Sequence, residues 1–131
     1  MKTKKPKTIS LPRMHSQYAG GVVMGVMAGQ AGKPDYLLIH VGNSHDRLTF
    51  DQALAWSKTT SGEDGPTRRE LSMLFANRRE GQFKPEWHWS VEPFASDERY
   101  AWVQYFFYGF QYYDHGDNDF RAVAVRRVPF Q

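Results

Sequence analysis

Apolar residues divide the chain into a strand-rich first third, a helical middle and a second strand-rich region. Residues 18–28 and 36–41 are two apolar or aromatic runs. The six residues 30–35 between them contain the Gly and Pro of a chain reversal. This pattern predicts a β-hairpin.

The middle of the chain has the spacing of two short amphipathic helices. In residues 49–58 apolar side chains recur near helical spacing, and the leading Thr49 is able to cap the first turn. Farther along, Thr67 stands three residues before Glu70, which is the arrangement of a capping box, and an apolar stripe follows. We expect both helices. We also expect the arginines around the second one to stay in solvent: Arg68, Arg69, Arg78 and Arg79.

The second half of the chain predicts an antiparallel sheet with long loops. From Trp87 onward, short aromatic and β-branched runs are broken by Pro93, Gly109 and the polar turn at 114–119. The run YAWVQYFFY at 100–108 is expected to form one continuous strand. On such a strand alternate side chains share a face, which would group Trp102, Gln104, Phe106 and Tyr108.

The order of hairpin, two helices and sheet predicts a single α+β domain over residues 11–131. Residues 1–10 carry four lysines ahead of any apolar pattern, and we expect them to form a flexible basic tail. The chain has 131 residues and no cysteine, which excludes disulfides, thiolate metal sites and cysteine nucleophiles. Its aromatic fraction is high, at 15%.

Four motifs in a fixed order resemble a known family. They are PTRRELSMLFAN (66–77), WHWSVE (87–92), AWVQYFFYGFQ (101–111) and RAVAVRR (121–127). Together they resemble a phage and prophage family related to the C-terminal domain of collagen-like bacterial adhesins, which is similar to the variable proteins diversified by retroelements. The sequence departs from that family at Gly65, where Leu is usual, and at Val91, where Ser is usual.

The resemblance implies a C-type-lectin-like fold, with two short helices packed on antiparallel β-sheet with long loops. It also implies that the aromatic region mixes framework residues with ligand-contacting ones. The framework positions would be Ala101, Trp102, Gln104, Phe106, Gly109 and Gln111. The candidate ligand-binding residues would be Tyr105, Phe107, Tyr108, Phe110, Tyr112, Tyr113, Asp114, His115, Asp117, Asn118 and Asp119.

Physical chemistry gives a separate reason to expect a contact surface. Four exposed rings would form an apolar patch of about 600 Å² or more, which is the size of functional patches on monomers. Tyrosine offers rigid area and a hydroxyl at small entropic cost. We therefore expect a non-enzymatic recognition domain, phage- or prophage-encoded, that binds a protein or glycan surface, with Tyr108, Tyr112 and Tyr113 as anchors.

Other interpretations of the same residues remain open. The rings could form the core of a strand buried on both faces, or the interface of a homo-oligomer. A small phage inhibitor of a host defence protein would need the same surface. A nucleic-acid-binding protein would use the rings for stacking and arginines for phosphates, although the neighbouring Asp residues would repel a phosphate backbone.

The sequence contains few patterns typical of catalytic or metal-binding sites. The five histidines are scattered, and no serine stands in a nucleophile-elbow pattern. Asp114, Asp117 and Asp119 lack the spacing of an EF-hand loop and are expected to form a polar turn. We expect no catalytic residues, no metal and no cofactor. We also expect no membrane insertion and, without a visible signal peptide, a location in the bacterial cytoplasm or a virion.

Overall fold

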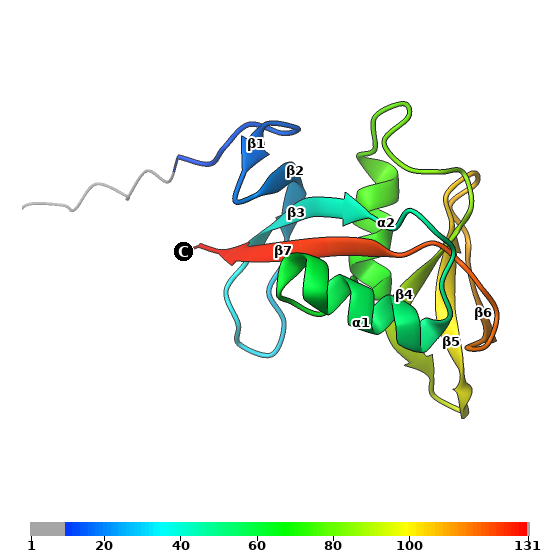
Figure 1. Ribbon diagram of the computed structural model, residues 1–131. Coiled ribbons are helices and arrows are strands. Elements are labelled where there is room, and N and C mark those ends of the chain that lie inside the picture. Colours follow the sequence, from blue (N-terminus) through cyan, green and yellow to red (C-terminus); the bar gives the residue numbers. More distant parts are fainter. Residues whose placement is uncertain (1–9, 131) are drawn as a thin grey trace, which may run out of the picture.

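The computed structural model describes residues 10–130, so the tail expected at 1–10 lies almost wholly outside the described residues. The described chain is an α+β structure with two helices and two antiparallel sheets (Figure 1). In chain order the elements are β1 (Gln17–Tyr18), β2 (Gly21–Met27), β3 (Tyr36–Asn43), α1 (Phe50–Ser61), α2 (Arg68–Ala76), β4 (Trp87–Phe94), β5 (Asp97–Tyr105), β6 (Gln111–His115) and β7 (Val123–Pro129). Within residues 10–130, neither helix is long and apolar enough to cross a membrane.

One sheet joins strands from both ends of the described chain, in the order β1-β2-β3-β7. The β2–β3 hairpin confirms the reversal expected at residues 30–35. The second sheet has the order β4-β5-β6. The two sheets are linked where Phe120 pairs with Leu48 and Arg121 pairs with His88, just before the chain enters β7.

Both helices begin where their capping residues predict. The Thr49 hydroxyl accepts the amide of Gln52, whose side chain in turn accepts the Thr49 amide, and Thr67 and Glu70 form the same reciprocal pair. The first helix continues to Ser61, three residues past the expected end at residue 58, and ends where Gly62 adopts a φ of 79°.

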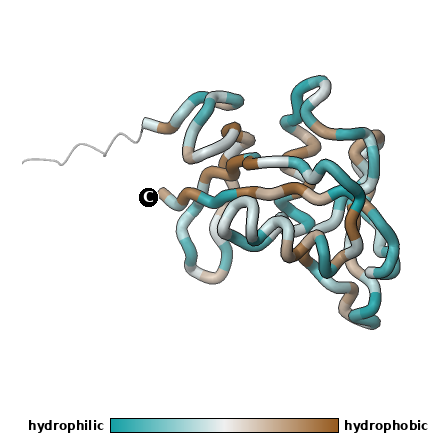
Figure 2. The backbone as a smooth tube through the Cα atoms, viewed as in Figure 1, coloured by the Kyte–Doolittle hydropathy of each residue, from teal (hydrophilic) through white to brown (hydrophobic). Residues whose placement is uncertain are grey.

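The core lies where the two helices pack against both sheets. Met24, Leu38 and Val125 of the larger sheet pack with Leu71 and Leu74 of α2. A second cluster joins α1 to the smaller sheet through Ala53, Trp89 and Val103. Figure 2 shows the hydrophobic positions gathered on the strands, while hydrophilic positions follow the loops.

Two expectations about exposure and strand length are wrong. Arg68 is not a free solvated arginine, because its guanidinium lies 3.5 Å from the centre of the Trp102 ring. The strand expected over 100–108 ends at Tyr105. Phe106 is buried while Tyr108 is exposed, so the two do not share a strand face. The reason is a tight turn that starts at residue 106.

Candidate functional site

The β5–β6 hairpin carries most of the candidate residues, and a tight turn shapes its tip. The amide of Gly109 donates to the Tyr105 carbonyl at 2.6 Å, and the amide of Tyr105 donates to the Phe110 carbonyl at 2.9 Å. Gly109 has a φ of 92°, and a Cβ at this position would stand 2.4 Å from Cε2 of Phe75. Only glycine combines that backbone angle with that contact.

The turn sends consecutive aromatic side chains in opposite directions. Phe106 is 2% exposed and packs into the core against Phe83, at 5.0 Å between ring centres. The rings that follow lie in solvent, with exposed fractions of 53% for Phe107, 67% for Tyr108, 57% for Phe110 and 58% for Tyr112. A side chain's place in the turn therefore decides whether it belongs to the core or to the surface.

At the tip of the hairpin, five rings form a continuous cluster. We call this the tip cluster; it comprises Trp87, Tyr105, Phe107, Tyr108 and Phe110. Trp87 and Tyr105 stack at 4.9 Å across the β4–β5 pair, and Tyr108 stacks on Phe110 at 5.8 Å. Trp87 and Tyr105 are half-buried, so they form the base on which the exposed rings lie.

A second group of rings lies farther along the hairpin. This strand cluster comprises Phe94, Tyr100, Trp102, Tyr112 and Tyr113. Tyr113 stacks on Phe94 at 4.0 Å and on Tyr112 at 4.8 Å, in both cases nearly parallel. Because both faces of its ring are covered, Tyr113 supports Tyr112. It offers a ligand only its edge and hydroxyl, which is less than its expected role as an anchor.

Side-chain amides hold the hairpin on α2. Gln104 is buried, and its Nε2 donates to the carbonyl of Gly109 at 2.9 Å. Its Oε1 accepts Nε2 of Gln111 at 3.0 Å. Gln111 Oε1 in turn accepts Nε of Arg68 at 2.8 Å. Gln104, Gly109 and Gln111 are framework positions that the resemblance implies, and their hydrogen bonds fix the turn that presents the rings.

The acidic candidates lie in the turn after β6, and some of them hold that turn together. Asp114 accepts the His115 amide at 2.8 Å and is also bonded to the Asn118 side chain. The amide of Asp117 donates to Nδ1 of His115 at 3.1 Å. The side chains of Asp117 and Asp119 are left facing solvent. The loop is thus a closed polar turn with an acidic outer side.

The neighbouring β4–β5 turn adds to this acidic side. Asp97 and Arg99 form an exposed ion pair at 2.7 Å, and hydrogen bonding to Arg99 lowers the pKa of Asp97 to about 2. Asp97 therefore neutralises Arg99, while Glu98 beside it remains exposed. The amide of Gly116 donates to the Arg99 carbonyl at 2.8 Å, which places the two acidic turns next to each other.

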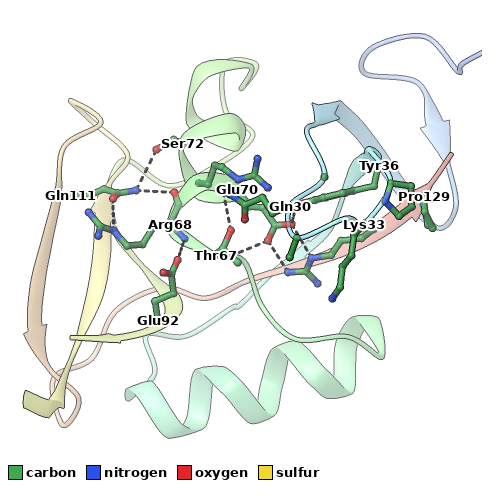
Figure 3. A pocket seen from close by; sticks show the side chains of 15 residues that line it. Gln30, Lys33, Tyr36, Thr67, Arg68, Glu70, Ser72, Glu92, Gln111 and Pro129 are labelled. Atoms are coloured by element: carbon green, nitrogen blue, oxygen red, sulfur yellow. Dashed lines mark hydrogen bonds and ion pairs between the residues drawn. The ribbon is translucent and has the colours of Figure 1, made fainter. Parts of the chain in front are cut away.

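A cavity of about 870 Å³ lies between the β2–β3 loop and the start of α2 (Figure 3). Its wall includes Tyr36, Glu70 and Arg127 on one side and Arg68 and Gln111 on the other. The cavity therefore reaches the first residue of β6. Sequence patterns gave no sign of it, because Glu70 stands out only as a capping residue.

A buried charged pair forms the wall of this cavity. Glu70 is fully buried and receives Nη2 and Nε of Arg127 at 2.7 and 2.8 Å, together with the Tyr36 hydroxyl at 2.7 Å. Burial alone would raise the pKa of Glu70, but the Arg127 hydrogen bonds and charge outweigh it and lower that pKa. Burial, and then the bond to Glu70, raise the pKa of Tyr36 to about 12. The hydrogen-bonding groups of Glu70, Arg127 and Tyr36 are therefore paired with one another.

Within residues 10–130, His, Asp and Glu form no group of three or more that is placed to hold a metal ion. The histidines instead have structural contacts. His88 is buried, donates from Nδ1 to the Glu86 carbonyl at 2.9 Å, and packs on Phe106 at 4.3 Å. Burial lowers the pKa of His88 to about 4. His88 is therefore a core histidine.

Comparison with known proteins adds no family to this description. Neither protein-family models nor curated proteins matched the chain. The residues that sequence reasoning missed are half-buried partners of the exposed rings, namely Trp87, Phe94 and Tyr100. Their aromatic character was visible in the sequence, but the pairing of β4, β5 and β6 was needed to bring them under the candidates.

Proposed function

We propose that this chain is a non-enzymatic recognition domain with a C-type-lectin-like fold, which binds a protein or glycan surface through the rings of the β5–β6 hairpin. One observation carries the proposal: Phe107, Tyr108, Phe110 and Tyr112 are all more than half exposed on one hairpin. Large apolar groups gathered in this way normally meet a partner.

The construction of the hairpin supports this proposal. The exposed rings lie on half-buried rings, and the buried side-chain amide of Gln104 fixes the backbone of the turn that carries them, so they are held in place before a ligand arrives. Rigid, preorganised aromatic groups lose little conformational entropy on binding. The hydroxyls of Tyr108 and Tyr112, and the acidic turns beside them, would give the contact specificity.

The arrangement of elements supports the C-type-lectin-like part of the proposal. Two short helices cover antiparallel sheets, and the aromatic hairpin belongs to the second sheet, as the resemblance implies. The implied framework residues Ala101, Gln104 and Phe106 are buried, whereas Phe107 and Tyr108, which follow them, are exposed. A phage- or prophage-encoded protein would use this surface for recognition, and an inhibitor of a host defence protein would use the same surface.

The test is partner capture with a matched control. One variant replaces Phe107, Tyr108, Phe110 and Tyr112 with Ser. The control replaces Tyr18 and Val26, which are also exposed but lie in the other sheet, with Ser. Both variants are compared with the wild type in pull-downs from bacterial lysates at two salt concentrations, after circular dichroism has shown that they fold.

If the proposal is correct, the wild type and the control retain a protein or glycan that the hairpin variant loses. This capture should depend little on salt. Identical captures by all three chains would overturn it. Nucleic acid released by salt from all three chains would overturn it as well, and would favour a role for the arginines.

A further inference from the structure

We propose that β6 is a docking edge, to which an extended, basic segment of a partner protein adds as a fourth strand of the β4-β5-β6 sheet. The proposal rests on the recognition function proposed above and specifies how the partner binds. It makes the partner a protein, and it assigns a role to the backbone of β6 that no side chain reveals.

The register of the hairpin shows which backbone groups of β6 face outward. At one end Tyr105 bonds to Phe110, and at the other Arg99 bonds to Gly116. Between these ends the pairing has no register shift. Since bonded pairs alternate in an antiparallel ladder, the amides and carbonyls of Tyr112 and Asp114 face β5. Those of Gln111 and Tyr113 therefore face away from it.

Over residues 10–130, the other sheet edges are short or occupied. The outer side of β4 is bonded by Arg121, through the Trp87 carbonyl and the Trp89 amide, and its Val91 amide donates to Pro66. At β7, the Arg127 amide donates to Glu63 at 3.2 Å. The remaining edge is formed by β1, which has two residues, and by the part of β2 beyond it, where the register shifts between Val23 and Gly25 and the Met24 carbonyl accepts Nδ2 of Asn77.

Among the described residues, no hydrogen bond occupies the outward backbone groups of Gln111 and Tyr113, whereas those of His115 are bonded to Asp114 and Asn118 and end the free edge. Exposed edges are usually protected by Lys, Pro or a bulge. The sequence of β6 is QYYDH, without Lys or Pro, and its pairing with β5 is regular, whereas the pairings β2–β3, β3–β7 and β4–β5 all contain irregularities. An edge left open beside exposed rings is typical of peptide recognition by strand addition.

Charge complementarity selects the occupant. At the His115 end of β6, the exposed carboxylates of Glu98, Asp117 and Asp119 lie in the two adjacent turns, and Arg99 is already paired with Asp97. A segment with Lys or Arg at that end is attracted to these carboxylates. A second copy of β6, whose sequence is QYYDH, would bring no Lys or Arg to these carboxylates.

The side chains of the added strand would have defined neighbours. Alternate residues of a strand face opposite sides of its sheet. On one side the neighbour on β6 is Tyr112, and on the other side it is Gln111, which lines the 870 Å³ cavity. We therefore expect a partner segment that alternates β-branched or aromatic residues with basic ones.

The test uses a display library of 12-residue peptides, with the full chain as bait. The proposal expects enrichment of extended, basic peptides without internal Pro. The best peptide is then synthesised with N-methyl groups on alternate amides, in either of the two possible sets. Methylation of the set that faces β6 should weaken binding about tenfold or more, while the other set should bind like the parent.

Variants of Tyr113 test the same point on the protein. Both Tyr113→Ala and Tyr113→Pro lose the ring, but only the Pro variant loses the outward amide. We expect Tyr113→Pro to bind the peptide about tenfold more weakly than Tyr113→Ala, with the fold of both checked by circular dichroism. Asp117→Asn with Asp119→Asn should weaken binding and reduce its dependence on salt.

The outcomes separate this proposal from the one on which it rests. Failure to enrich basic extended peptides, or equal binding by both methylated sets, would overturn strand addition. Recognition by the rings would still stand if the hairpin variant, with Ser in place of Phe107, Tyr108, Phe110 and Tyr112, lost the partner captured from lysate. If the hairpin variant kept the peptide and Tyr113→Pro lost it, the proposed ring surface would fail and the docking edge would stand. A dimer that Tyr113→Pro dissociates would make a second copy the occupant and overturn the proposal.

Discussion

Glu70 and Arg127, which lie 57 positions apart in the sequence, form a two-point ion pair that ties α2 to the last strand of the larger sheet. Its two N–O distances are 2.7 and 2.8 Å, and Glu70 has no contact with solvent. A carboxylate buried in this way is stable as an anion only while its cation is present.

Removing one partner of this pair should strongly destabilise the protein. We expect Arg127→Met to lower the free energy of unfolding by about 3 kcal/mol or more, because Glu70 is then buried without its cation. Adding Glu70→Met should recover part of that loss. Urea denaturation measures all three proteins. The exposed pair Lys58–Asp64, at 3.6 Å, supplies the control, since Asp64→Asn should change stability by about 0.5 kcal/mol or less. A small effect of Arg127→Met would contradict the role assigned to the pair.

Because of His88, the free energy of unfolding should decrease as the pH is lowered from about 6.5 to about 4. Its folded pKa is depressed to about 4, so the unfolded chain binds a proton first as the pH drops below the ordinary value of about 6.5. The stabilising contribution is therefore complete above 6.5 and is lost on approach to 4, at a cost of about 3 kcal/mol. Urea denaturation at several pH values measures the slope.

His88→Gln is the control for this pH dependence. It should reduce the slope without abolishing it, because burial also lowers the pKa of His40. Glu70 affects only the acidic end of this range, since its own pKa is lowered and its contribution begins to be lost only below its ordinary value of about 4.5. An unchanged slope in the variant would show that His88 is not the group that titrates.

Two adjacent phenylalanines should differ sharply in their effect on stability. Phe106→Ala removes a ring that is buried against Phe75, Phe83 and His88, and should cost about 3 to 5 kcal/mol. Phe107→Ala removes an exposed ring and should cost about 0.5 kcal/mol or less. Thermal and urea unfolding of the two variants measure the difference. Equal losses would mean that the turn does not divide core from surface as described.

The hairpin turn should not tolerate a side chain at residue 109. Gly109→Ala places a Cβ against Phe75 at a φ of 92°, and we expect a loss of about 2 kcal/mol or more together with weaker partner binding. Gly62→Ala is the control, because its φ is 79° but no atom lies within 4 Å of the new Cβ. Its loss should be about 1 kcal/mol. If the two variants lose equal stability, contact with Phe75 does not matter.

The sequence determined those features that depend on neighbours a few positions away. A capping box needs residues three apart, so Thr49 with Gln52 and Thr67 with Glu70 fix where both helices begin. The β2–β3 hairpin follows from two apolar runs and the turn residues between them. Composition and motif also concentrated the candidate contacts on residues 105–119 before any geometry was known.

Tertiary structure alone decided which of those candidates face solvent and what supports them. Strand β5 ends at Tyr105 because Gly109 lies against Phe75, a contact between helix and turn that no local pattern contains. Arg68 is not free in solvent because its guanidinium lies over the ring of Trp102, 34 positions later in the chain. The outer side of β4 is not a free edge because Arg121, 34 positions after Trp87, bonds to it. Such contacts depend on how distant segments fill space and pair their backbone groups. A periodic pattern along the chain therefore does not predict them.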